Sequence, residues 1–169
     1  VLEVRTTRIS IGTWKNNCLH KVTDKDGWWT SGDVAELKHI NGFEQLKIFG
    51  RVDTAINSGG ETIFPEALEE KLMSKAIRVG LPIKHVIFLA IKDCDWGERL
   101  LALIEWKEHL ISETPQNIIN LKSIVKNWPP AERPIKWYQC KDLSANRYGK
   151  YERKKLSLEL KNKLFSGEI

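Results

Sequence analysis

Apolar residues in the C-terminal two thirds of this 169-residue chain fall into short runs of strand length. Residues 86–91 and 100–106 are two such runs, and residues 93–98 form an acidic turn between them. Residues 135–140 have the same character. Short apolar runs that turn residues bound are typical of strands inside a sheet. The pattern therefore predicts three strands in this part of the chain.

Three segments with helical spacing alternate with these strands. Residues 65–76 begin with a proline, carry glutamates early and place lysines later, as the helix dipole favours. A second helix is predicted after Thr114 as N-cap and Pro115 in the first turn, and it ends at Pro129-Pro130. Its apolar stripe consists of Ile118, Leu121, Val125 and Trp128. The last helix is basic, and its apolar face consists of Leu156, Leu160 and Leu164.

Two glycine turns predict hairpins. Asn41-Gly42 separates the strand-like residues 34–40 and 43–49, and Gly59-Gly60 makes a second tight turn. From about residue 54 the order is hairpin, helix, strand, strand, helix, strand, helix. This order predicts an α/β (α+β) domain with a short mixed sheet covered by helices. Upstream, residues 1–14 alternate loosely, and we expect a strand pair there that contains Val4, Ile9 and Ile11.

The composition is that of a globular protein and excludes few functions. The net charge of +5 suits anionic small molecules or nucleic acid equally. No apolar run has the length of a membrane span, and no signal peptide begins at Val1. Cys18, Cys94 and Cys140 form no CxxC pair, so we expect ordinary packed thiols and a cytoplasmic location. The four histidines are scattered, and no metal ligand set is predicted.

The hairpin over residues 34–49 is predicted to bring two charged residues together. Asp33 precedes its first strand and Arg51 follows its second, and the two ends of an antiparallel hairpin lie side by side. A carboxylate there can accept hydrogen bonds from ribose hydroxyls, and a guanidinium can bind ribose or phosphate oxygens. A surface salt bridge of Arg51 with Asp33 or Glu61 is the structural alternative.

Two further turns present candidate residues. Lys150 follows Gly149 at the tip of a polar loop before a helix, where its ammonium can meet negative charge that develops on phosphorus or a carboxylate. A solvated lysine-rich face is the alternative reading. Glu61 and the Gly59-Gly60 pair can line a channel for a narrow ligand, since missing side chains leave room. The alternative there is a plain turn.

Three segments, in order, resemble motifs of the adenylate-forming enzymes, the group of acyl- and aryl-CoA synthetases, adenylation domains and luciferases. GWWTSGD at 27–33 is similar to the family's Trp-x-x-Thr-Gly-Asp segment, with Ser31 where Thr is usual. GRVDTAINSGGETIFPEALEE at 50–70 resembles the hinge and the loop that follows it. LSANRYGKYERKKL at 143–156 resembles the closing Gly-Lys motif, with Tyr148 where Ser or Thr is usual.

The resemblance implies roles for the candidate residues. Asp33 would bind the ribose hydroxyls of ATP and of the acyl-AMP, and Arg51 would contact ribose or phosphate. Asp53 would be the hinge about which a small domain swings between two poses. In the first pose Lys150 would stabilise charge while the adenylate forms. In the second, the loop Ser58–Glu61 would line the pantetheine tunnel as the CoA thiolate attacks.

Within the family the likeness is strongest to the o-succinylbenzoate–CoA ligases of menaquinone and phylloquinone biosynthesis. The stretches SGGETIFPEALEE, DCDWGERLLALIEW and ERPIKWYQCKDL carry it. It implies ATP, CoA and an aromatic carboxylic acid as ligands, with Mg²⁺ bound mainly by an N-terminal domain that is absent here. Residues 1–52 would be the β-rich tail of that large domain and residues 53–169 the AMP-binding lid. We expect no ligase activity from this chain alone.

Two other readings stay open. A fatty-acid or other aryl-CoA synthetase would keep the same chemistry with another acid. A basic nucleic-acid-binding module would explain the charge and the lysine-rich last helix. The tryptophans, however, do not interleave with basic residues as a base-stacking platform requires, and no nucleic-acid motif appears. We therefore expect no nucleic-acid partner.

Overall fold

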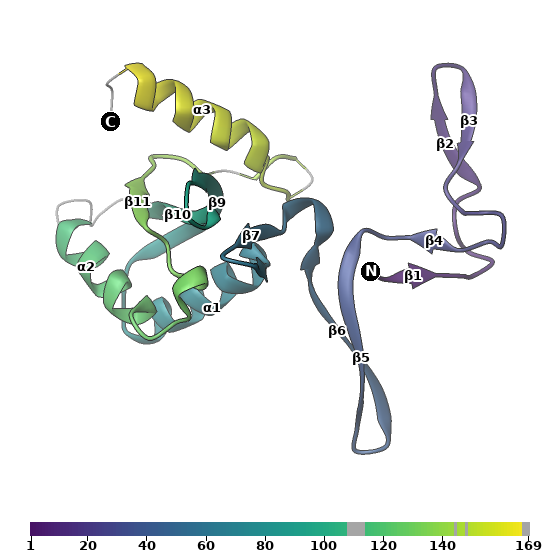
Figure 1. Cartoon of the computed structure of the whole chain (residues 1–169), viewed down its shortest axis with the longest axis horizontal. Helices are drawn as coiled ribbons and strands as arrows, with labels where there is room; N and C mark the ends of the chain where they lie inside the picture. The colour runs from purple at the N-terminus through teal and green to yellow at the C-terminus, as the bar shows by residue number, and fades with distance from the viewer. Residues whose placement is uncertain (108–113, 144, 148, 167–169) are drawn as a thin grey trace. The chain divides into compact units, whose positions relative to one another are not determined.

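The computed structural model describes residues 1–107, 114–143, 145–147 and 149–166, which divide into two compact units (Figure 1). Unit 1 is Val1–Ala55 and unit 2 is Ile56–Ile169. Within the part of the chain described, no helix is long and apolar enough to cross a membrane.

Unit 1 consists of strands that pair two by two, all antiparallel. The pairs are β1 (Glu3–Val4) with β4 (Trp29–Thr30), β2 (Gly12–Lys15) with β3 (Cys18–Lys21), and β5 (Asp33–Ile40) with β6 (Phe43–Arg51). A 3-10 turn, η1 (Val52–Thr54), follows β6. The predicted β5–β6 hairpin is confirmed: Asn41 and Gly42 at its turn have φ of 53° and 81°, as a type I′ turn requires.

The predicted strand pair within residues 1–14 is wrong. β1 pairs with β4, so Glu3 lies opposite Thr30, 27 residues away. The segment after β1 turns, and Ile9 N donates to Thr6 O. A second hairpin, β2–β3, turns at Asn16 and Asn17, both at positive φ, which asparagine tolerates better than most residues. Loose alternation did not reveal the partner of β1, because that partner is not its neighbour in sequence.

Unit 2 is built on a mixed sheet. Its central strand, β10 (Gly97–Trp106), pairs antiparallel with β9 (Ile83–Asp93) and parallel with β11 (Lys136–Gln139). The short hairpin β7 (Ile56–Ser58) and β8 (Glu61–Ile63) joins β10 where Ser58 lies opposite Gly97. The sequence reading found these strands but made β9 and β10 too short, since hydrogen bonding continues past their apolar centres.

Helices cover this sheet, as predicted, and they lie on both of its faces. α1 (Pro65–Arg78) and α2 (Thr114–Val125) lie on one side, and α3 (Arg153–Ser166) lies on the other (Figure 1). A 3-10 turn, η3 (Pro130–Glu132), follows α2. α2 ends three residues before Trp128, which is nevertheless buried in the same core as α1. The side chains of Thr114, Pro115 and Leu164, and all of Tyr148, lie outside the described residues.

Alternation along β10 divides the interior into two apolar clusters. Leu100, Ala102 and Ile104 face α1 and α2, and Leu101 and Leu103 face α3. Each of these side chains is at most 2% exposed, because both faces of the sheet are covered. A strand buried on both faces reads as a continuous apolar run, which is why this one stood out in the sequence.

Two thiols differ from expectation. Cys18 and Cys94 are exposed, and Cys140 is half-buried against the second cluster. Of the three cysteines, only Cys140 is packed against the core, as the sequence analysis had predicted for all three. Cys94 lies in the acidic turn after β9, where exposure follows from the turn itself.

Candidate functional site

The structure brings Asp33 and Arg51 together at the open end of the β5–β6 hairpin. They are opposite residues in the ladder, and Arg51 Nη1 lies 3.5 Å from Asp33 Oδ1. Asp33 is half-buried and Arg51 is exposed, so the pair faces solvent. The predicted adjacency is confirmed. The distance is that of a loose ion pair, which contributes little stability at a surface.

Arg51 also bonds to Asp53, the residue expected to be the hinge. Arg51 Nε donates to Asp53 Oδ1 at 2.8 Å, and Nη1 donates to Ser31 O at 3.3 Å. Gly32 makes room for this arrangement, because a Cβ there would lie 3.0 Å from Arg51 Nη2. The guanidinium thus lies between two carboxylates, with its direction fixed by the backbone of the preceding turn.

The Gly59-Gly60 turn packs against the acidic turn that joins β9 and β10. Gly59 N donates to Trp96 O at 3.0 Å, and a Cβ on Gly59 would lie 2.5 Å from the Trp96 indole. A Cβ on Gly60, by contrast, would meet nothing within 4 Å. Both glycines have positive φ, 59° and 85°. Gly59 is therefore required by a close approach, while Gly60 leaves an open surface beside it.

The two residues that flank this turn differ in exposure. Ser58 is fully buried, and its Oγ has no partner among the described residues. Glu61 is exposed. The opposing turn is stabilised within itself: Asp93 Oδ1 accepts from the backbone N–H of Asp95 and Trp96, at 3.1 and 3.0 Å. The hairpin thus presents an exposed carboxylate and a bare backbone on a rigid base.

Lys150 lies at an exposed turn that Asn146 closes. Asn146 N donates to Lys150 O at 2.9 Å, and Lys150 N donates to Asn146 Oδ1 at 3.0 Å. Gly149 N donates to Asn146 O at 2.8 Å, and Gly149 itself has φ of 73°. The lysine backbone is fixed on both sides while its side chain extends into solvent. The sequence analysis identified Lys150 but not the role of Asn146, although an Asn three residues before a Gly-Lys pair is a turn signal.

A buried carboxylate anchors the chain before this turn. Glu105 in β10 accepts from Lys84 Nζ at 2.6 Å, from His85 Nδ1 at 3.0 Å and from Leu143 N at 2.9 Å. Burial alone would raise the pKa of Glu105, but these hydrogen bonds outweigh it and lower the pKa to about 2. Glu105 is therefore an anion at neutral pH and holds Leu143, at the start of the loop, in place.

A second buried pair anchors the chain after the turn. Arg153 donates to both carboxylate oxygens of Glu69, at 2.6 and 2.8 Å, and to Phe88 O at 2.9 Å. Both side chains are mostly buried. Such bidentate pairs are geometrically specific as well as strong. No sequence signal marked this pair, because its members are 84 residues apart and each lies in a charged helical segment.

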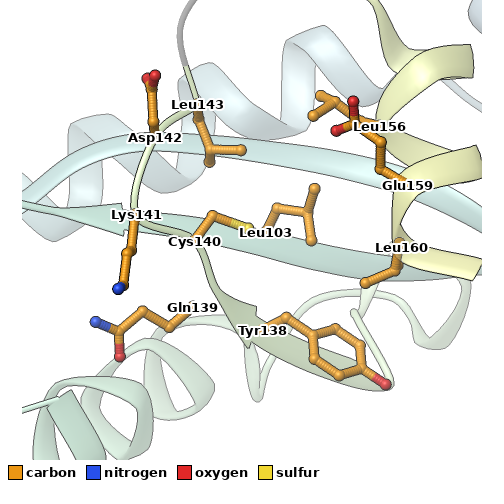
Figure 2. A pocket seen from close by; sticks show the side chains of 10 residues that line it. All are labelled: Leu103, Tyr138, Gln139, Cys140, Lys141, Asp142, Leu143, Leu156, Glu159 and Leu160. Carbon is orange, nitrogen blue, oxygen red and sulfur yellow. The ribbon is translucent and has the colours of Figure 1, made fainter. Parts of the chain in front are cut away.

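A pocket of about 690 Å³ opens on the α3 face of unit 2 (Figure 2). Apolar and polar side chains from β10, β11, the segment after β11 and α3 line it, and the Cys140 sulfur extends toward Leu103 (Figure 2). None of the residues that the sequence singled out for chemistry lines this pocket. The candidate residues thus form separate groups: the Asp33–Arg51–Asp53 cluster within unit 1, and the exposed Gly59-Gly60 and Gly149-Lys150 turns within unit 2.

Comparison of the whole chain with solved structures found chains of similar fold. A variant of MenE from Escherichia coli with bound OSB-AMS matches 94% of this chain and 31% of that chain, with a TM-score of 0.67 and 25% identity. The chain is thus similar in sequence and fold to part of MenE, and the mixed α/β fold class predicted from sequence is confirmed. No family model matches the chain.

Its curated relatives are acid–CoA ligases. The 2-succinylbenzoate–CoA ligase of Salmonella typhimurium is 24% identical over 135 residues, which are 79% of this chain and 26% of that protein. The enzyme of the same name from Escherichia coli is 30% identical over 103 residues, 61% of this chain and 21% of that protein. Other relatives are CoA ligases named for different acids. The chain therefore spans about a quarter of the length of the curated relatives it matches.

Proposed function

We propose that this chain is the C-terminal part of an ATP-dependent acid–CoA ligase, which makes an acyl-adenylate and then a thioester. Residues 1–52 would be the tail of a large N-terminal domain, and residues 53–169 the lid. One observation carries the proposal: in a unit whose fold matches these enzymes, the Gly149-Lys150 tip and the Gly59-Gly60 turn are both exposed on rigid supports.

In the first half-reaction the acid carboxylate attacks the α-phosphorus of ATP, and pyrophosphate leaves. Negative charge grows on the phosphoryl oxygens, and the Lys150 ammonium would stabilise it. Asp33 would accept hydrogen bonds from the ribose hydroxyls, for which its half-exposed carboxylate is suited. Arg51 would contact ribose or phosphate. Mg²⁺, bound mainly by residues outside this chain, would neutralise the pyrophosphate.

In the second half-reaction the lid would turn about Asp53. The CoA thiolate attacks the carbonyl carbon of the mixed anhydride, and AMP leaves. The open backbone at Gly60, with Ser58, Gly59 and Glu61 around it, would form one wall of the pantetheine tunnel. A bare backbone suits this task, because a narrow chain needs close approach without side chains in the way. Lys150 would have moved away by then, which separates the two steps.

The acid that we propose is o-succinylbenzoate, the substrate expected in menaquinone or phylloquinone biosynthesis, in a cytoplasmic enzyme. The names of the first relatives support it. A fatty acid or another aromatic acid is the second candidate, since relatives named for 4-hydroxybutyrate and 4-chlorobenzoate also match. With the large domain supplied, ATP–pyrophosphate exchange measured with each acid would distinguish them.

The test of the chemistry is Lys150→Ala in the longer ligase. Adenylate formation from acid and ATP should fall by about a hundredfold or more, as for removal of one preorganised charge donor. Thioester formation from preformed adenylate and CoA should change much less. Lys154→Ala is the matched control, because this exposed lysine lies one turn further along the chain. Equal losses in both half-reactions would contradict the two-pose scheme.

The organisation proposed for the chain has its own test. The 169 residues alone should form no acyl-CoA from acid, ATP and CoA, since the phosphate loop of the family and the acyl pocket would lie in the other domain. Thioester production by the purified chain, abolished by Lys150→Ala, would show that the chain holds a complete site and would overturn the domain assignment.

A further inference from the structure

One edge of strand β9 has no neighbouring strand in the described sheet, and an ion pair binds the backbone there. Within the described sheet β9 pairs with β10 alone. Phe88 N and Phe88 O both bond away from β10: the N–H donates to Glu69 Oε1 at 2.6 Å, and the carbonyl accepts from Arg153 Nη1 at 2.9 Å. The Glu69–Arg153 pair thus supplies the acceptor and the donor that a neighbouring strand would supply, and it protects an edge that would otherwise be exposed.

This pair joins three elements at one point. Glu69 comes from α1, Phe88 from β9, and Arg153 is the first residue of α3. Glu66, one turn before Glu69, lies 3.3 Å from Arg153 as well. The exposed fractions of the Arg153 and Glu69 side chains are 15% and 12%, so water competes little for these bonds. Loss of either partner leaves a charge without its match in a mostly buried position.

Arg153 also anchors the exit of the lysine turn. Only two residues separate it from Lys150. On the entry side Leu143, 1% exposed, donates its N–H to Glu105. Between these anchors Asn146 bonds with the backbone of Lys150, and the half-buried Tyr151 packs against the apolar cluster on the α3 side of the sheet. The position of the Lys150 backbone therefore depends on the start of α3 as well as on these local contacts, and Arg153 is bound at that start.

We infer that Glu69 and Arg153 are positioning residues for the adenylation step: their ion pair sets the location of the Lys150 turn and thereby of its ammonium. The inference rests on the function proposed above. Lysine is a point charge on a flexible stem, so its precision has to come from the backbone that carries it. A displacement of about 1 Å at a reacting centre can cost on the order of a hundredfold in rate.

The first test uses this chain as it stands. Arg153→Lys keeps the charge but loses the fork that holds both Glu69 oxygens and Phe88 O. Amide hydrogen exchange at Asn146 and Lys150 should accelerate by about tenfold or more, while amides of β10 keep their protection. Glu69→Gln should do the same, since it keeps the shape of the side chain. Unchanged exchange at Asn146 and Lys150 in both variants would overturn the inference.

The matched control is Glu132→Gln. Glu132 also forms an ion pair with α1, through Lys71 at 2.8 Å, but it lies on the opposite face of the sheet from the lysine turn. The same change of charge there should leave exchange at Lys150 as in the wild type. If Glu132→Gln accelerates it as much as Glu69→Gln does, the effect is one of net charge, and the inference fails.

The second test uses the longer ligase and separates the inference from the proposed function. Arg153→Lys should lower kcat of adenylate formation by about tenfold to a hundredfold with little change in KM for ATP, and should leave thioester formation from preformed adenylate nearly unchanged. Val125→Ala, a core change on the far side of the sheet, should lower stability without this selectivity.

No effect of Lys150→Ala would refute the proposed function. A large effect of Lys150→Ala together with equal losses in both half-reactions for Arg153→Lys would refute the positioning role alone.

Discussion

The two units of this chain have equally regular hydrogen bonding and very different interiors. The β5–β6 hairpin of unit 1 pairs continuously from Asp33 to Arg51, apart from one shift in register. Yet none of the residues of unit 1, all of which are described, is buried. Phe43 on this hairpin is 74% exposed and Leu37 60%. Unit 2 has a sheet of similar ladders, but two apolar clusters fill the space between it and its helices.

The difference shows that backbone hydrogen bonding between strands and an apolar core are separate requirements for a stable fold. Backbone pairing satisfies polar groups but contributes little net stability, because the unfolded chain bonds equally well to water. Apolar burial has to supply the rest, and an isolated two-stranded hairpin is at best marginally stable. The exposed apolar residues of unit 1 are therefore a surface that needs a partner. The large N-terminal domain proposed above would supply such a partner.

The largest expected effect comes from separating the two units. Residues 56–169 alone should fold, with a cooperative urea transition and a helical circular dichroism spectrum, because both clusters lie entirely within them. Residues 1–55 alone should show neither a cooperative transition nor slow amide exchange. The same measurements on the whole chain serve as the reference.

Either of two results would break the comparison. A cooperative transition in residues 1–55 would mean that the hairpins are stable without a core. Absence of one in residues 56–169 would mean that the clusters of unit 2 depend on unit 1. Each would also weaken the proposal that the lid is an autonomous body able to turn about Asp53.

Sequence reasoning succeeded where structure follows from local pattern. The turn at Asn41-Gly42, the helix after Pro65 and the apolar run of β10 each have a signal within a few residues. It failed where the partner is remote, as in β1 with β4. The ends of β9 were missed for another reason: His85 extends the ladder by backbone bonds, which the apolar pattern does not report.

The candidate site divides in the same way. Asp33 and Arg51 could be paired in advance, because a hairpin fixes which residues lie opposite. Lys150 was found from its place beside a glycine. The residues that support these turns were not found from the sequence. Trp96 packs against Gly59 but is 37 positions away in sequence, and Glu105 is a single acidic residue in an apolar run. A lone carboxylate at a core position is a signal that partners exist, but it does not name them.

The next prediction concerns how the stability of unit 2 depends on pH through Glu105. The folded pKa of Glu105 is about 2, below its ordinary 4.5, so the ionised form stabilises the fold above pH 5 and this contribution is lost as the pH falls through 2. Glu105→Gln should therefore destabilise unit 2 by roughly 2 to 3 kcal/mol at pH 7, and the gap from wild type should close toward pH 2. Urea unfolding at several pH values measures this.

A surface carboxylate of unit 1 is the control. Glu36 pairs with Lys38 at 3.1 Å, but both side chains are nearly half exposed. Glu36→Gln should change the unfolding free energy by no more than about 0.5 kcal/mol at any pH. A gap for Glu105→Gln that stays constant from pH 7 to pH 2 would show that lost packing, rather than lost charge, causes the effect.

The smallest expected effects come from one substitution made in two similar turns. Gly42 in unit 1 and Gly60 in unit 2 have φ of 81° and 85°, and a Cβ on either meets nothing within 4 Å. Alanine at each should cost roughly 1 to 2 kcal/mol of local strain. Because the units differ in their cores, Gly60→Ala should lower the urea midpoint of unit 2, whereas Gly42→Ala should leave it unchanged. Equal shifts from both would mean that the two units unfold as one.

Comparing Gly59→Ala with Gly60→Ala distinguishes the cost of backbone strain from the cost of a steric contact in the same turn. Gly59→Ala has the same left-handed strain as Gly60→Ala, but its Cβ would also meet the Trp96 indole at 2.5 Å. Gly59→Ala should therefore cost more than Gly60→Ala, and Trp96→Ala should abolish the excess in a double-mutant cycle. An excess that persists without the indole would place its origin in the backbone, and the rigid support assigned to this turn would then not come from Trp96.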